Sequence, residues 1–248
     1  RAGAIPIAPG EPGTGRYAIL AEGLGEPTWL TVSGTDTLAL VDQTALGGIY
    51  RVDLAGAAAT PMLLLEDGTD LTSLATSTDG TDLLAATLDG KLLEVPLDGS
   101  PWTTLATGLF SPGALCPFTA DKLYLAEHQA SGGIEYASLA ELDLSTLKLT
   151  ALTGFTIPFT VHGIVRGDAS RLLVRDDLGL RTFDLATSQL APYYAVEADA
   201  VTDVAAAWPY GWVAWYDRGP GPDYRIYSFD FSRSTQHLVA SGSGVQPV

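Results

Sequence analysis

The sequence has 248 residues, of which 46% are hydrophobic, and this is enough to bury the core of one large domain or two small ones. Thirteen basic and 29 acidic side chains give a formal charge of −16, so the surface repels a phosphate backbone and no nucleic acid is expected as a partner. No apolar run approaches the roughly 18 residues of a transmembrane segment, and a single cysteine, Cys116, excludes an internal disulfide.

The N-terminal stretch RAGAIPIAPGEPGTG is rich in Ala, Pro and Gly. It is typical of a mature start that follows a removed leader. We therefore expect an exported bacterial protein, located in the periplasm, at the cell surface or outside the cell.

A short pattern recurs five times: an apolar residue, Asp or Pro, another apolar residue, and then a turn. The copies are VDLAG (Val52–Gly56), VPLDG (Val95–Gly99), LDLST (Leu142–Thr146), FDLAT (Phe183–Thr187) and FDFSR (Phe229–Arg233). Their central positions, Asp53, Pro96, Asp143, Asp184 and Asp230, are separated by 43, 47, 41 and 46 residues. A period of about 44 residues is that of a four-stranded propeller blade.

Four strands are expected in each repeat. A small apolar strand such as LTSLATS and a strongly apolar one such as LLAATL form an inner pair, and LLEVPL and WTTLATG form an outer hairpin. Small residues suit the innermost strand, because blades converge on the axis there. The predicted units are Leu24–Asp67, Gly68–Gly108, Leu109–Gly154, Phe155–Val196 and Glu197–Gly244.

The fragment STDGTDLL, at Ser77–Leu84, resembles the Ser-x-Asp-Gly-x-x-Leu turn of many bacterial propellers of the TolB-like, NHL-like and WD40-like classes. The resemblance implies a single all-β propeller domain with almost no helix. It implies no particular function, because one such fold serves many unrelated functions. Residues Ala4–Gly23 and the C-terminal GVQPV together predict an incomplete sixth blade built from both termini. The alternative is five blades with an N-terminal arm.

Each predicted second strand ends in an acidic residue: Asp42, Asp89, Glu127, Asp176 with Asp177, and Asp217. In a propeller these ends emerge on one face, together with Asp70 and Asp203, which open first strands. A ring of carboxylates is suited to a hard cation, so Asp42, Glu127 and Asp217 are candidate metal ligands and calcium is the candidate cofactor. The alternative is a solvated rim, since Asp before Gly is also ordinary turn chemistry.

Long loops are predicted after three of these strand ends, at Asp42–Gly48, Glu127–Ser138 and Tyr216–Tyr224. Recognition commonly lies on long loops over a rigid scaffold, and the alternative is a loop without function. The candidate ligand-binding residues on this face are Asp42, Glu127, His128, Asp177, Asp203, Asp217 and Arg218. His162, on the predicted innermost strand VHGIVRG, is a candidate base or metal ligand that Asp70 and Asp203 would join, and hydrogen-bonded packing is its alternative.

Enzyme signatures such as GxSxG, HExxH, CxxC and the Walker loop are absent from the sequence. Calcium-dependent propeller lactonases, which the chain resembles only in fold, typically use Asn among their metal ligands, and this sequence contains no Asn. We therefore expect a non-catalytic binding or scaffolding module with a protein or small-molecule ligand. The alternatives are a metal-dependent hydrolase or lactonase-like enzyme and a subunit of a larger surface assembly.

Overall fold

The computed structural model describes residues 27–34, 37–42, 48–53, 61–65, 70–154, 156–194, 201–207, 210–217, 223–230 and 235–243. These residues divide into two compact units. Unit 1 consists of residues 27–129 and 138–154, and unit 2 of residues 130–137 and 156–243. Within this part of the chain, no helix has the length and apolar character that crossing a bilayer requires.

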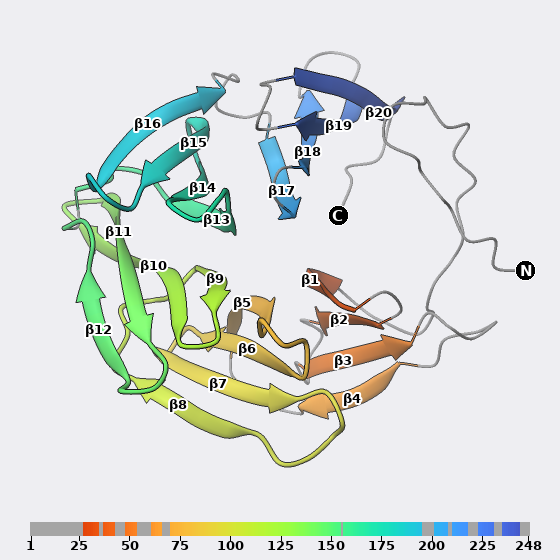
Figure 1. Cartoon of the computed structure of the whole chain (residues 1–248), viewed down its shortest axis with the longest axis vertical. Helices are drawn as coiled ribbons and strands as arrows, with labels where there is room; N and C mark the ends of the chain where they lie inside the picture. The colour runs from red at the N-terminus through yellow and green to blue at the C-terminus, as the bar shows by residue number, and fades with distance from the viewer. Residues whose placement is uncertain are drawn as a thin grey trace, which may run out of the picture. The chain divides into compact units, whose positions relative to one another are not determined.

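Unit 1 contains three four-stranded sheets in which neighbouring strands follow one another along the chain (Figure 1). The first sheet consists of β1 (Pro27–Ser33), β2 (Thr37–Asp42), β3 (Gly48–Asp53) and β4 (Met62–Leu65). The second consists of β5 (Leu71–Thr76), β6 (Asp82–Thr87), β7 (Lys91–Pro96) and β8 (Thr103–Thr107). The third consists of β9 (Ala114–Thr119), β10 (Lys122–Ser131), β11 (Ile134–Asp143) and β12 (Lys148–Ala151). Adjacent sheets contact each other through their first strands, β1 with β5 and β5 with β9.

Unit 2 contains two further sheets of the same design. The fourth consists of β13 (Val161–Arg166), β14 (Arg171–Asp176), β15 (Gly179–Asp184) and β16 (Gln189–Tyr194). The fifth consists of β17 (Val201–Ala207), β18 (Tyr210–Asp217), β19 (Asp223–Asp230) and β20 (Thr235–Ser243). The strands pair in antiparallel fashion, and β13 contacts β17.

The sheets confirm the all-β prediction of four-stranded units. Each sheet lies within one of the five predicted repeats, and the central residue of the recurring pattern is the last residue of the third strand every time. These residues are Asp53 in β3, Pro96 in β7, Asp143 in β11, Asp184 in β15 and Asp230 in β19. The predicted terminal blade, from residues 4–23 and 244–248, lies outside the described residues.

The aspartates of the pattern stabilise the turns that follow the third strands. Asp143 Oδ1 accepts hydrogen bonds from the backbone nitrogens of Ser145 and Thr146, both at 2.9 Å, and Asp184 makes equivalent contacts. Hydrogen bonds from the Ser145 hydroxyl and the Thr146 backbone lower the pKa of Asp143 to about 2. The carboxylate is therefore ionised at neutral pH and accepts both backbone groups.

The Asp-Gly turn between β6 and β7 requires its glycine. Gly90 has a φ of 82°, and its backbone nitrogen donates to the carbonyl of Thr87 at 3.0 Å. A Cβ atom at this position would lie 2.2 Å from the carbonyl oxygen of Leu109. Only glycine tolerates both this dihedral angle and this approach, so the turn packs directly against the segment that leads into the third sheet.

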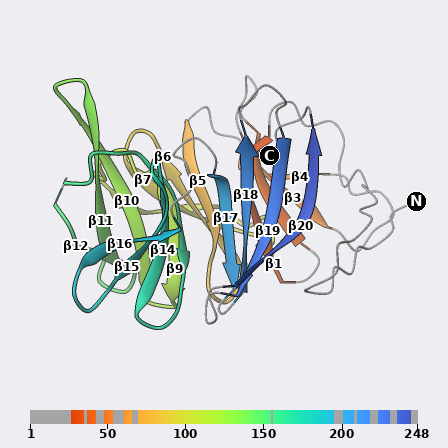
Figure 2. The same ribbon diagram turned by 90° about the horizontal axis from the view of Figure 1, so that it is seen from above.

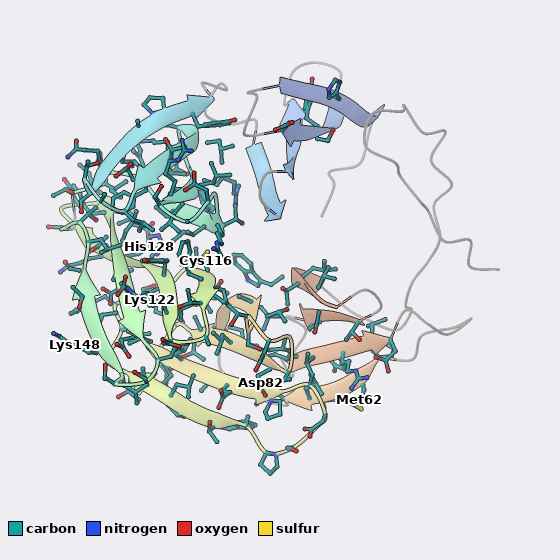
Figure 3. The ribbon with its side chains drawn as sticks, viewed as in Figure 1. Met62, Asp82, Cys116, Lys122, His128 and Lys148 are labelled. Carbon is teal, nitrogen blue, oxygen red and sulfur yellow. The ribbon has the colours of Figure 1, made fainter. Side chains whose placement is uncertain are left out.

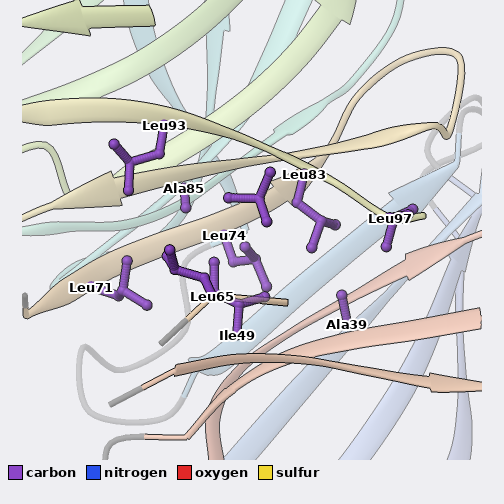
Figure 4. Packing of buried hydrophobic residues seen from close by; sticks show 10 residues of the cluster. Ala39, Ile49, Leu65, Leu71, Leu74, Leu83, Ala85, Leu93 and Leu97 are labelled. Carbon is purple, nitrogen blue, oxygen red and sulfur yellow. The ribbon is translucent and has the colours of Figure 1, made fainter. Parts of the chain in front are cut away.

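The core of unit 1 lies between neighbouring sheets. Ten buried side chains of the first and second sheets form one cluster (Figure 4): Ala39, Ile49, Leu65, Leu71, Leu74, Leu83, Ala85, Leu93, Val95 and Leu97. A second cluster, which includes Leu84, joins the second sheet to the third. Leu83 and Leu84 are consecutive in β6 and point to opposite faces, so both faces of this sheet are buried. Each such leucine contributes about 1.5–3 kcal/mol to folding.

The hairpin of β10 and β11 is longer than its counterparts. These strands have ten residues each, whereas β6, β7, β14 and β15 have six. The prediction of a long loop over residues 127–138 is therefore wrong, because Gly132 and Gly133, at φ 63° and 82°, form a tight turn between the two strands. The hairpin extends beyond the other strands of its sheet (Figure 2), and its tip, residues 130–137, belongs to unit 2.

Candidate functional site

Three second strands end at the acidic residue that the sequence indicated. β2 ends at Asp42, β14 at Asp176 and β18 at Asp217, whereas β6 ends two residues before Asp89. The side chains of Asp42, Asp203 and Asp217 and the whole of Arg218 lie outside the described residues. Their roles in binding a ligand or a metal remain predictions.

Glu127 and His128 lie within β10 and are almost fully buried, with 4% and 7% of their surface exposed (Figure 3 labels His128). Glu127 Oε1 accepts a hydrogen bond from the backbone nitrogen of Phe110 at 2.9 Å, and His128 Nδ1 lies 3.1 Å from the carbonyl oxygen of Ser111. The expectation that both side chains project from a loop is wrong, because β10 continues to Ser131. Both side chains fix the segment that enters β9.

His162 lies on the first strand of its sheet, as predicted, and meets Asp177, which directly follows β14. His162 Nε2 and Asp177 Oδ1 are 2.7 Å apart. A carboxylate oxygen only accepts, so Nε2 carries the proton, and in the neutral ring Nδ1 is an acceptor. Asp177 Oδ2 accepts a hydrogen bond from the backbone nitrogen of Thr160 at 3.1 Å. The imidazole is thereby held in one orientation while 37% of its side chain and 48% of Asp177 stay exposed.

The predicted association of His162 with Asp70 and Asp203 stays a prediction. Asp70 belongs to unit 1, and the side chain of Asp203 lies outside the described residues. The sequence placed Asp177 on the predicted ligand-binding face and His162 on an innermost strand, and it gave no reason to pair them.

A buried ion pair anchors the turn that carries Asp177. Asp176 is 3% exposed, and its Oδ2 lies 2.8 Å from Nε of Arg181, while its Oδ1 accepts a hydrogen bond from the backbone nitrogen of Leu178 at 2.9 Å. Burial raises the pKa of Asp176 above its ordinary value, and the Leu178 hydrogen bond and the Arg181 charge oppose this shift. The Arg181 guanidinium carbon lies 5.6 Å from the ring centroid of Phe159. These contacts position Asp177.

The carboxylate of Glu135, at the tip of the β10–β11 hairpin, lies next to the His162–Asp177 pair. The Thr160 hydroxyl donates to Glu135 Oε2 at 3.2 Å, and the backbones of Ala137 and Ile157 exchange hydrogen bonds of 2.8 and 3.3 Å. Glu135 is thus connected through Thr160 to Asp177. Sequence reasoning missed both residues, because their meeting depends on the hairpin fold, and the only signal was the unusual length of the segment between the two predicted strands.

Among the described residues, no three His, Cys, Asp or Glu side chains are grouped so that they could hold one metal ion. Of the three predicted calcium ligands, only the Glu127 side chain is described, and its carboxylate already accepts the Phe110 hydrogen bond. Calcium binding through Asp42 and Asp217 therefore remains a prediction.

No family model and no curated protein matches the sequence. Solved structures do match the fold. The chain is similar to an oligogalacturonate lyase in complex with manganese, at 15% identity and a TM-score of 0.56, and the match covers 84% of this chain and 62% of that one.

Two other solved structures show the same likeness. TolB from Acinetobacter baumannii matches at 14% identity and a TM-score of 0.60, over 82% of this chain and 52% of that one. The extracellular domain of a one-component system from B. thetaiotaomicron matches at 12% identity and a TM-score of 0.56, over 90% of this chain and 36% of that one. The chain spans less than two thirds of the length of each of these neighbours. At these identities the likeness concerns the fold, and the chain has the β-propeller fold that its repeats predicted.

Proposed function

We propose that this chain is a single-domain, non-catalytic binding propeller that recognises a polar ligand at the His162–Asp177 pair. The observation that carries the proposal is a half-exposed imidazole held 2.7 Å from a carboxylate whose other oxygen is also hydrogen-bonded. A side chain that is already fixed loses little conformational freedom when a ligand arrives, so this arrangement favours binding.

The ligand that best fits this site is neutral and carries hydroxyl groups. Nδ1 of His162 accepts a hydrogen bond in the neutral ring, and the carboxylates of Asp177 and Glu135 accept others. The formal charge of −16 disfavours an anion. A hydroxyl nucleophile needs a base such as histidine to take its proton, and the Thr160 hydroxyl instead donates to Glu135. This supports binding in preference to nucleophilic catalysis.

The second candidate is a metal-dependent hydrolase. The same pair favours it, because histidine ligands of metals usually donate their other ring nitrogen to a carboxylate. One structural neighbour is an oligogalacturonate lyase in complex with manganese. Manganese and calcium titrations of the purified protein distinguish the two candidates, since stoichiometric binding that His162→Gln abolishes supports the hydrolase.

Calorimetric titration with a panel of neutral oligosaccharides tests the binding proposal. We expect at least one of them to bind the unmodified chain, and His162→Ala and Asp177→Asn to weaken that binding about tenfold or more, which is the size of one or two lost hydrogen bonds. His237→Ala, at an exposed histidine of β20, is the matched control and should leave the affinity unchanged. The proposal is wrong if no oligosaccharide binds, or if His162→Ala and His237→Ala behave alike.

Export remains part of the proposal. The extracellular domain among the structural neighbours supports it. A scaffolding role in a larger assembly would appear as concentration-dependent association in light scattering.

A further inference from the structure

A groove of about 290 Å³ lies between the second and third sheets of unit 1. It is at the end of these sheets where the β5–β6 and β9–β10 turns lie. None of the candidate site residues that the sequence indicated and the structure describes lies at this end.

The floor of the groove is apolar. Leu84, which is 2% exposed, lies there with the partly buried Leu105, Pro117 and Leu144. Leu84, Leu105 and Leu144 belong to the cluster that joins the second and third sheets. An apolar floor open to solvent is able to bury the hydrocarbon part of a ligand.

The rim of the groove carries four carboxylates, from Asp79, Asp82, Glu94 and Asp121, and its lining contains no Lys or Arg. None of the four takes part in an ion pair with another described residue. A hydrogen bond from the hydroxyl of Ser77, with further ones from Thr81, lowers the pKa of Asp79, which favours its charged form. The groove therefore combines an apolar floor with uncompensated negative charge.

We propose that this groove binds the basic side chain, Arg or Lys, of a peptide segment in a partner protein. Such a side chain has an apolar stem and a cationic head, and these match the floor and the rim of the groove respectively. The volume lies at the lower limit of about 300–1,000 Å³ for small-molecule sites, so it suits a single long side chain. A cation would also relieve the repulsion among the four carboxylates.

The experiment uses a pair of peptides that differ only in charge. A fluorescein-labelled Ala-Arg-Ala-Arg-Ala peptide and its citrulline counterpart, which is neutral and nearly the same shape, are titrated with the full chain at low ionic strength and followed by fluorescence anisotropy. We expect the arginine peptide to bind and the citrulline peptide to bind about tenfold more weakly, because each exposed charge pair changes the affinity a few-fold and the effects of two pairs multiply.

Charge-matched variants locate the site. Asp82→Asn with Glu94→Gln removes two charges from the groove and should weaken binding of the arginine peptide about tenfold. Asp70→Asn with Asp89→Asn removes two charges from the opposite end of the second sheet and should change it less than about twofold. Glu94→Gln alone replaces the first variant if that variant melts at a lower temperature. Equal binding of both peptides, or equal losses in the two double variants, would overturn the proposal.

Discussion

Single residues decide whether the turns of this propeller close, and Gly90 is the strongest case. Replacing it with alanine should lower the free energy of unfolding by more than about 2 kcal/mol. The left-handed φ of 82° costs about 1–2 kcal/mol for a residue with a Cβ atom, and the carbonyl of Leu109 at 2.2 Å must also move. Equilibrium unfolding in urea measures the change.

Gly108→Ala is the matched control for this substitution. Gly108 has a φ of 81°, and a Cβ atom there would meet nothing within 4 Å. This substitution should therefore lower the free energy of unfolding only by the cost of the left-handed φ, about 1–2 kcal/mol. Equal losses at Gly90 and Gly108 would show that the close approach to Leu109 is unimportant for stability.

The sequence predicted residues that interact with their neighbours along the chain, and it did not predict residues that pair with distant ones. Asp143 and Asp184 act on backbone groups two or three positions away, so the recurring pattern located them correctly. His162 and Asp177 are 15 residues apart and on different elements. Their contact depends on the register of β13 against β14, which no short pattern contains.

At the scale of elements, Glu127 connects β10 to the segment that enters β9, and its substitution separates this structural role from ligand binding. Glu127→Ala should lower the free energy of unfolding by about 1–3 kcal/mol, because the hydrogen bond from the backbone nitrogen of Phe110 to Glu127 is lost. Glu127→Gln keeps an acceptor oxygen, so it should lower the free energy of unfolding clearly less than Glu127→Ala does. Urea unfolding of both variants is the measurement, and equal stability of all three proteins would contradict the structural role.

The β10–β11 hairpin shows why the length of a strand was harder to predict than its presence. The stretch from Gln129 to Glu135 is mostly small and polar, and such composition is typical of a loop. The extension is supported instead by contacts beyond the hairpin, such as the backbone pairing of Ala137 with Ile157. These contacts join segments that no local pattern relates.

At the scale of the whole molecule, the period of the repeats predicted the fold, because each repeat corresponds to one four-stranded sheet, and the second sheet buries apolar residues on both faces. It did not predict the groove of unit 1. Asp79 and Asp82 belong to the turn STDGTDLL that the sequence analysis identified, yet Asp121 reaches the same rim from the third sheet. Turn chemistry explains the first two residues, and only the packing of two sheets brings the third beside them.

The formal charge of −16 leads to a last prediction, which concerns stability in salt. Within the described part of the chain, five Lys or Arg side chains pair with carboxylates, and four of these pairs are at least partly exposed. Salt therefore removes little attraction, whereas it screens the repulsion of the excess carboxylates. Raising NaCl from 0.01 to 0.15 M shortens the Debye length from about 30 to about 8 Å. We expect calorimetry to show a Tm higher by about 2–4 °C, the shift that roughly 1 kcal/mol produces in a domain of this size.

Choline chloride is the control for this experiment, because a bulky organic cation screens charge without entering an oxygen-ligand site. It should raise the Tm as much as NaCl does, and a Tm that stays constant or falls in both salts would show that the acidic surface does not limit stability.

Calcium chloride at matched ionic strength should give the same gain if the carboxylates at the ends of β2 and β18 are a solvated rim. A larger gain in calcium, lost in Asp42→Asn with Asp217→Asn, would instead establish a cation site there.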